Sequence, residues 1–330
     1  MIHPKLLQQF IVEPGTKVNL KHFPTDWTET DNAKILGKEH GKEFGKEHGK
    51  EHGRNAIKEQ ANEVLAESRR QLDEAQDLLY ASDTYSVLLI FQAMDAAGKD
   101  GTIRHVMSGV NPQGCQVFSF KKPSVEELDH NFLWRYMKAL PERGRIGIFN
   151  RSYYEDVLVV KVHPEWLGPG QPAKPDDKFW DKRYQDINNF EKHLARNGML
   201  ILKFFLHLSK DEQKRRFLER LTNPRKHWKF SEADLAEREH WMDYQQAFED
   251  AITATSTKRA PWHIIPADRK FVARALVADI ITTAIQKLKL EYPKVTAEKM
   301  VLLEAARARL EKKQDSDDKE KEPQPSHRMA

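Results

Sequence analysis

Cysteine is nearly absent from this chain of 330 residues, which holds Cys115 alone. An intrachain disulfide is therefore impossible, and stability must come from a packed core. Long apolar runs are also missing, because the run from Val87 to Phe91 is far shorter than the roughly 20 residues of a membrane-spanning helix. The first residues lack the apolar run and cleavage site of a secretory signal. We therefore expect a cytoplasmic protein with no membrane partner.

Charge of one sign does not dominate the chain either. Lys and Arg total 54 against 50 Asp and Glu, a formal net charge of +4 at pH 7. The excess is local, since residues 203–229 carry nine basic side chains and only three acids. A basic segment in a balanced chain indicates a surface for a polyanion or phosphate, although a solvated helix face is the plain alternative.

The first part of the chain has little periodicity and several turn residues. Residues 1–36 contain Pro4, Pro14 and Pro24 and are expected to form an extended arm that wraps or tethers to the core. Four tandem Gly-Lys-Glu-His/Phe tetrapeptides follow. A glycine in every turn costs a helix about 1 kcal/mol relative to alanine. We interpret residues 37–54 as a low-complexity insertion rather than a metal site built on His48 and His52, and we end the N-terminal region at residue 56.

Short apolar runs alternate with helical patterns over the rest of the chain. The expected strands are 85–91, 116–120, 145–149, 199–206 and 262–265; the expected helices are 55–80, 124–140, 176–196, 209–221, 231–254 and 268–290. This alternation predicts an α/β fold with a doubly wound parallel sheet of about five strands, flanked by helices. We assign 57–292 to a catalytic domain and 293–330 to a C-terminal helix and a tail that is disordered from Lys312.

The first strand runs directly into Ala93-Met-Asp-Ala-Ala-Gly-Lys-Asp-Gly-Thr102, a variant of the G-x-x-x-x-G-K-[ST] phosphate loop. Gly98 lets the backbone approach phosphate oxygens, and Lys99 supplies a compact positive charge. Asp95 would repel phosphate unless it held a cation, so we interpret it as a Mg²⁺ ligand or as a group that organises the waters of the ion, with Asp100 a weaker candidate. A strand, turn and helix without any ligand is the plain alternative.

The third strand ends in Asn150-Arg151-Ser-Tyr-Tyr-Glu155. Arg151 could bridge donor and acceptor phosphates, or it could be a structural ion-pair partner. We favour catalysis, because neutralising charge on the transferring oxygens is the main contribution a protein makes to phosphoryl transfer. Farther along, Asn223-Pro224 breaks a helix before the basic and aromatic run Arg225–Lys229, which suits a mobile cover over a charged ligand.

These segments resemble the polyphosphate kinase 2 family, most closely its class III. The resemblance rests on seven segments across residues 57–290: Phe91–Thr102, Asn111–Gly114, Ile146–Ser152, Trp180–Arg183, Leu202–Ser209, Trp228–Ser231 and Ala260–Trp262 with Ile265–Asp268. It implies a P-loop kinase-like fold with a helical lid at about 209–232. The implied reaction is Mg²⁺-dependent phosphoryl transfer between inorganic polyphosphate and AMP or ADP, with guanine nucleotides as further candidates. It also implies a homo-oligomer, a dimer or tetramer, with no nucleic-acid partner.

The resemblance also assigns roles to residues. Asp95, Lys99, Asn150, Arg151 and Glu155 are the expected catalytic residues, with Asp95 on the metal and Glu155 on the acceptor side. Phosphate or polyphosphate contacts are expected from Ala97, Gly98, Asp100, Gly101, Thr102, Arg104, Lys203, Arg215, Arg216, Arg220 and Lys229. One rival is an ATP-dependent nucleoside monophosphate kinase with the same loop and lid. A weaker rival is a non-enzymatic metal- or nucleic-acid-binding protein built on the His repeat and the basic lid.

Overall fold

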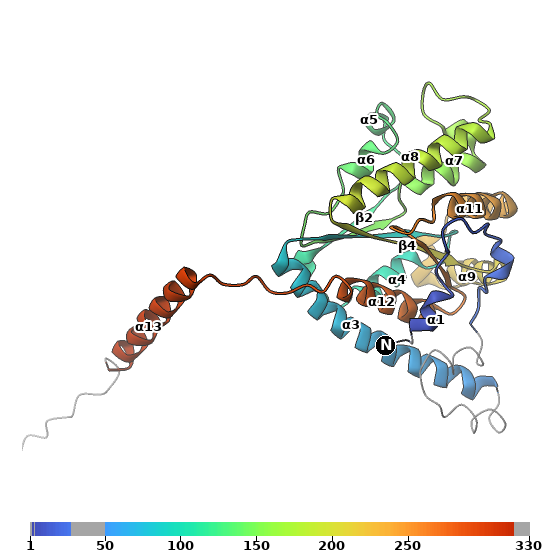
Figure 1. Ribbon diagram of the computed structural model, residues 1–330. Coiled ribbons are helices and arrows are strands. Elements are labelled where there is room, and N and C mark those ends of the chain that lie inside the picture. The colour runs from blue at the N-terminus through green and yellow to red at the C-terminus, as the bar shows by residue number, and fades with distance from the viewer. Residues whose placement is uncertain (1, 3, 28–49, 320–330) are drawn as a thin grey trace, which may run out of the picture. The chain divides into compact units, whose positions relative to one another are not determined.

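Five parallel strands form one sheet in the computed structural model, which describes residues 2, 4–27 and 50–319 (Figure 1). The strands are β1 (Ser86–Gln92), β2 (Cys115–Ser119), β3 (Ile146–Asn150), β4 (Met199–His207) and β5 (Trp262–Pro266), in the spatial order β2-β3-β1-β4-β5. All four neighbouring pairs are parallel. The predicted parallel α/β sheet is therefore confirmed, and each predicted strand lies within one or two residues of its observed position.

Helices surround this sheet. The α-helices are α1 (Pro4–Gln8), α3 (Lys50–Ser82), α4 (Lys99–Val106), α5 (Val125–Leu128), α6 (Trp134–Met137), α7 (Val159–Val162), α8 (Asp177–Arg196), α9 (Lys210–Thr222), α10 (Glu232–Glu239), α11 (Trp241–Thr255), α12 (Lys270–Gln286) and α13 (Ala297–Lys319). Short 3₁₀ turns are η1 (Leu20–His22), η2 (Pro112–Gly114), η3 (Tyr153–Val157), η4 (Pro164–Trp166) and η5 (Pro224–Lys229).

Successive side chains of β1 enter two different cores, because a strand points alternate residues to opposite faces. Val87, Leu89 and Phe91 pack with α3, α4 and α12 on one face. Leu88 and Ile90 pack with α8 and α11 on the other. The helices therefore form two layers that bury the sheet between them (Figure 1). Burial on both faces explains why the central strands are continuously apolar.

Three helix predictions differ from the structure. The region 124–140 holds only α5 and α6, because the Asn131 side chain accepts a hydrogen bond from Leu133 N and starts a new turn. The helix expected at 231–254 is broken at His240 into α10 and α11. Helix α3 spans Lys50–Ser82 in the described part of the chain, so residues 50–54 of the expected insertion are helical. Residues 37–49, and with them most of the repeat, lie outside the described residues.

The N-terminal arm packs on the core as expected. Ile11 forms an antiparallel bridge with His263, Val12 N donates to Trp262 O at 2.9 Å, and Ile264 N donates to Phe10 O at 2.8 Å. These bonds cover the free edge of β5 and protect it from pairing with another chain. The arm residues from 4 to 27 therefore belong to the same compact unit as the sheet.

A second compact unit begins at Glu291 and contains α13. This helix continues to Lys319, so the first part of the tail expected to be disordered from Lys312 is helical. Among the helices of the described residues, none combines the length and apolarity needed to cross a bilayer.

Candidate active site

The loop between β1 and α4 has the backbone of a phosphate-binding turn. Gly98 is the N-cap of α4 and takes a left-handed conformation at φ 102°. Ala96 also has a positive φ of 62°, which is costly for a residue with a Cβ and persists only where the surroundings hold it. In the described part of the chain, no oxygen accepts a hydrogen bond from the amides of Gly98, Lys99, Asp100 or Gly101. These free donors at a helix N-terminus form an anion site.

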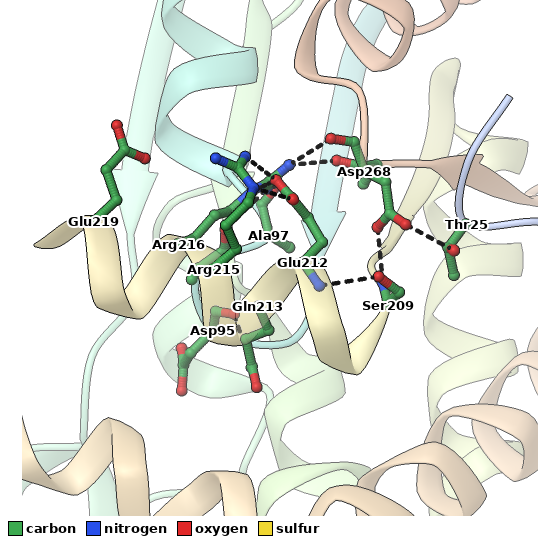
Figure 2. A network of polar contacts seen from close by, with 12 residues as sticks. Thr25, Asp95, Ala97, Ser209, Glu212, Gln213, Arg215, Arg216, Glu219 and Asp268 are labelled. Atoms are coloured by element: carbon green, nitrogen blue, oxygen red, sulfur yellow. Dashed lines mark hydrogen bonds and ion pairs between the residues drawn. The ribbon is translucent and has the colours of Figure 1, made fainter.

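Side chains hold the carbonyls of this loop away from the free amides. Lys99 Nζ donates to Ala93 O at 2.9 Å, and Gln213 Nε2 donates to Asp95 O at 3.0 Å. Arg216 donates to Ala96 O at 2.9 Å and to Ala97 O at 2.8 Å. Figure 2 shows Gln213 and Arg216 reaching the loop from one helix, α9.

The end of β3 brings the second catalytic motif to this loop. Arg151, which has a φ of 65°, places one guanidinium nitrogen 3.1 Å from Asp95 Oδ1 and another 3.6 Å from Glu155 Oε2. Gln92 Nε2, at the end of β1, donates to Glu155 Oε1 at 3.0 Å. The structure thus joins Asp95, Arg151 and Glu155, three of the expected catalytic residues, in one half-buried network.

The charges of this network act on one another. Burial is the main cause that lowers the pKa of Lys99, and the nearby Arg151 cation lowers it further, while Asp95 and Glu155 oppose the shift. Glu155 is the main cause that raises the pKa of Arg151, which therefore stays charged. Lys99 and Arg151 therefore interact electrostatically with the same two carboxylates, Asp95 and Glu155.

Asn150 is the last residue of β3, and its side chain contacts the start of α4. Its Nδ2 donates to Asp100 Oδ1 at 2.6 Å and to Ser119 Oγ at 3.3 Å, and the residue is 9% exposed. The amide therefore orients Asp100 in the first turn of α4. Asp100 Oδ1 is thus tied to β3, whereas Asp95 Oδ1 accepts from Arg151.

The residues present fit a magnesium ion held mainly by substrate. Among the described residues, no three His, Cys, Asp or Glu side chains converge on a metal site. Asp95 Oδ1 accepts from Arg151, and in the described part of the chain no hydrogen-bond donor reaches Asp95 Oδ2. Mg²⁺ keeps several waters and commonly binds one or two carboxylates together with phosphate oxygens. Asp95 alone can supply that protein ligand.

Among the described residues, four of the eight Lys and Arg side chains in the expected lid at 209–232 form ion pairs with acids. Arg215 contacts Glu212 at 2.6 Å, Arg220 contacts Asp234 at 2.7 Å, and Lys226 contacts Glu219. Lys229 is exposed, and its ammonium lies 4.9 Å from the centre of the Trp228 ring. The expected cover at 221–231 includes the 3₁₀ turn η5.

The expectation that Lys203 contacts phosphate is wrong, because its side chain is buried in the core. It is 0% exposed in β4, and its ammonium donates to Glu191 Oε2, Tyr154 Oη and Thr255 O, each at 2.8 Å. The alternation of β4 points this side chain into the core, where the carboxylate of Glu191 compensates the charge. Removing one partner of such a buried pair typically costs about 3–5 kcal/mol, so Lys203 is structural.

Three other expected phosphate contacts are also corrected in part. Arg216 is 4% exposed and contacts the loop backbone rather than solvent. The amides of Ala97 and Thr102 are already bonded, to Met94 O at 3.3 Å and Gly98 O at 2.9 Å. The open amides are therefore those of residues 98–101.

Two contributors to the site were missed from the sequence. One is Gln213, which holds the loop through Asp95 O. The other is Arg274 on α12, whose guanidinium lies 3.6 Å from where a Cβ on Gly101 would be. After burial, the neighbouring Arg104 is the largest cause that lowers the pKa of Arg274. Neither arginine forms an ion pair with a described acid. The Lys270-x-x-x-Arg274 spacing on one helix face was the available signal.

Known proteins share this sequence and fold. The family model described as Polyphosphate kinase 2 (PPK2) matches residues 55–293. An ADP-polyphosphate phosphotransferase of Rhodopseudomonas palustris is 56% identical over 244 residues, which cover 72% of this chain and 84% of the relative. An AMP/ADP-polyphosphate phosphotransferase of Meiothermus ruber is 48% identical over 247 residues, covering 74% and 89%.

A solved structure is also similar to this chain. The crystal structure of Polyphosphate Kinase 2 from Arthrobacter aurescens TC1 is similar with a TM-score of 0.75 and 36% sequence identity. The match covers 91% of this chain and 96% of that one. The similarity therefore extends over the whole sheet and the loop that carries the free amides.

Proposed function

The chain belongs to the polyphosphate kinase 2 family, and from this premise we propose that it transfers a terminal phosphoryl group from inorganic polyphosphate to AMP or ADP. The products are ADP and ATP. One observation of the structure carries the proposal: the free amides of residues 98–101 lie beside Lys99 and next to the network of Asp95, Arg151 and Glu155. This arrangement binds and neutralises phosphate oxygens, which is what phosphoryl transfer requires.

The transfer is a displacement at phosphorus. A phosphate oxygen of the acceptor nucleotide forms a bond to the terminal phosphorus, and the bond from that phosphorus to the bridging oxygen of the chain breaks. The shortened polyphosphate leaves with the bonding electron pair. Lys99, the free amides and Arg151 stabilise the charge on the transferring oxygens. Mg²⁺, held by Asp95 together with phosphate oxygens and water, supplies further positive charge when bound.

The donor side is supported by basic side chains that have no acid partner. Arg104 and Arg274 lie beside the first turn of α4, where a chain of phosphates leaving the loop would pass. Arg215 and Arg220 of the expected lid are paired with acids instead. We propose that the polyphosphate chain follows Arg104 and Arg274 and is covered by Arg215, Arg220 and Lys229 of the lid.

The acceptor range and the assembly are further parts of the proposal. We assign Glu155 to the acceptor side, with AMP and ADP both accepted and guanine nucleotides as candidates. One relative is named for ADP and the other for both AMP and ADP. We also propose a cytoplasmic homo-oligomer of two or four copies that binds no nucleic acid; the single cysteine suits a reducing compartment.

A matrix of acceptors and donors tests the proposal. AMP, ADP, GMP and GDP are each incubated with polyphosphate or with ATP, in the presence and absence of Mg²⁺. We expect AMP and ADP to be phosphorylated by polyphosphate only when Mg²⁺ is present. Phosphorylation of AMP by ATP but not by polyphosphate would identify an ATP-dependent monophosphate kinase instead. A Lys99→Ala preparation, purified in parallel, controls for contaminating kinases.

A further inference from the structure

We propose that Arg216 is a positioning residue that clamps the phosphate loop to the lid helix α9 and thereby sets the transfer rate without touching phosphate. The inference rests on the proposed function in one respect, since it takes this loop to hold the reacting phosphates. It replaces the expected role of Arg216 as a polyphosphate ligand.

The contacts of Arg216 use every donor that an arginine has. Its Nε donates to Glu212 Oε1 at 2.7 Å. One terminal nitrogen donates to Ala96 O and Ala97 O, at 2.9 and 2.8 Å. The other donates to Ala267 O and Asp268 O, at 2.6 and 3.1 Å. A guanidinium carries five N–H groups, so none remains for a phosphate oxygen.

The neighbouring Arg215 shows what an available lid arginine looks like. Its side chain is 60% exposed and bonds only to Glu212, whereas the Arg216 side chain is 4% exposed. Both arginines contact the same carboxylate, but successive helix positions point them in different directions. Figure 2 shows Arg216 extending between the loop at Ala97 and the turn at Asp268.

The clamp acts where the loop is strained. Ala96 has a φ of 62°, and its carbonyl is one of the two loop acceptors of Arg216. Bonds to both Ala96 O and Ala97 O fix the orientation of the two peptide groups that precede Gly98. The direction of the free amides at 98–101 follows from that orientation.

The second terminal nitrogen of Arg216 joins the phosphate loop to the turn between β5 and α12, and this turn contacts the start of the lid helix α9. Ala267 and Asp268 lie between β5 and α12. The Asp268 carboxylate accepts from Ser209 N at 2.8 Å, next to the first residue of α9, and from Thr25 Oγ1 of the arm at 2.9 Å. The phosphate loop, the start of α9 and the β5–α12 turn are therefore held as one body through Arg216 and Asp268 (Figure 2).

Substitution of Arg216 by lysine separates positioning from charge. Arg216→Lys keeps the positive charge, but a single ammonium cannot span both pairs of carbonyls. We expect kcat to fall by about 10- to 100-fold while the KM for polyphosphate changes by less than about threefold, because the loss concerns geometry and not ground-state binding. The salt dependence of that KM should match the parent. Arg70→Lys, an exposed arginine on α3 that also pairs with acids on its own helix, is the matched control and should keep parental kinetics.

A double-mutant cycle excludes a merely structural role. If Arg216 acts by positioning the loop that carries Lys99, then Arg216→Lys should reduce kcat much less in a Lys99→Met background than in the parent. Glu212→Gln weakens the clamp from its other side without changing side-chain size, and it should lower kcat about threefold with the polyphosphate KM retained.

Several results would overturn the proposal that Arg216 positions the phosphate loop. They are a parental kcat in Arg216→Lys or in Glu212→Gln, a weaker salt dependence of the polyphosphate KM in Arg216→Lys, or fully multiplicative effects in the cycle. A failure of the proposed function is distinguishable, because the parent itself would then show no turnover with polyphosphate. The same variants would in that case be compared with ATP as the donor.

Discussion

Lys203, Arg215 and Arg216 have the same formal charge, but their surroundings give them different roles. Lys203 lies in the core against Glu191, Arg216 holds backbone carbonyls, and Arg215 faces solvent beside Glu212. The count of basic residues at 203–229 therefore overstated the positive surface. Burial and direction, which composition does not encode, decide what a cation in this segment binds.

We expect activity to depend most directly on Lys99 and Asp95. Lys99→Ala removes a positive charge beside the free amides, and Asp95→Asn removes the carboxylate that can hold Mg²⁺. We expect each to lower kcat by about 100-fold or more, since such groups commonly supply several kcal/mol to phosphoryl transfer. Both side chains are only half-buried, so thermal unfolding should stay close to the parent. A variant that keeps near-parental turnover with unchanged Mg²⁺ dependence would remove that residue from the mechanism.

Glu155 has two possible roles that one substitution separates. It lies in the first turn of η3, where it contacts Arg151 and Gln92. If it occupies part of the space that a second phosphate fills, Glu155→Asn should reduce AMP phosphorylation by about tenfold more than ADP phosphorylation. Initial rates with each acceptor at saturating polyphosphate measure this. An equal fall for both acceptors would instead indicate that Glu155 only orients Arg151.

His263 makes stability depend on pH. Burial lowers the pKa of His263 to about 4, and the same cause lowers that of His207 to about 4. An unfolded chain would protonate both near pH 6.5, so between pH 6.5 and 4 the unfolded state binds more protons and the free energy of unfolding falls as pH falls. His263→Gln should make this fall shallower in denaturant titrations at pH 7, 6 and 5. If His263→Gln left the dependence of the free energy of unfolding on pH unchanged, the lowered pKa of His263 would be contradicted.

At the scale of elements, the strands could be predicted well and the helices less well. Strands β1, β3, β4 and β5 are buried on both faces, and apolar runs such as Val87–Phe91 predict this burial directly; the edge strand β2 is largely exposed. The region 124–140 has a helical composition, but it forms two short helices, α5 and α6, and Asn131 caps a separate turn between them. The predicted ends of the first and third strands also indicated where Asp95, Lys99 and Arg151 lie. Contacts between elements, such as Gln213 on the phosphate loop, leave no local pattern in sequence.

The lid and α12 should make donor binding sensitive to salt. Polyphosphate carries about one negative charge per phosphate, and exposed cations bind it by screened attraction. Charge removal at Lys229 or Arg274 should raise the polyphosphate KM by about three- to tenfold, with a smaller change in the nucleotide KM, and should flatten the salt dependence. Lys58→Gln, on α3 and outside the candidate site, provides the control. If the KM for polyphosphate did not change with salt concentration, a donor path along these side chains would be excluded.

At the scale of the whole molecule, the N-terminal arm contributes to the folded core, whereas the tetrapeptide repeat contains no residue of the proposed site. Arm residues such as Phe10 and Trp27 are buried in the core, so truncation of the arm would expose the β5 edge. A deletion that ends at residue 49 keeps all of the described helix α3, Lys50–Ser82. Removal of residues 37–49 should leave kcat and both KM values within about twofold of the parent, because every residue of the proposed site lies elsewhere. Loss of phosphoryl transfer would give the repeat a role in catalysis.

The most direct test of the account follows the phosphorus atom itself. The purified protein is incubated with AMP, Mg²⁺ and ³²P-labelled polyphosphate, with no ATP present, and the ADP formed is isolated. We predict that its β-phosphate carries the label at the specific activity of the polyphosphate residues. Unlabelled ADP, or no ADP until ATP is added, would contradict the claim that polyphosphate is the phosphoryl donor.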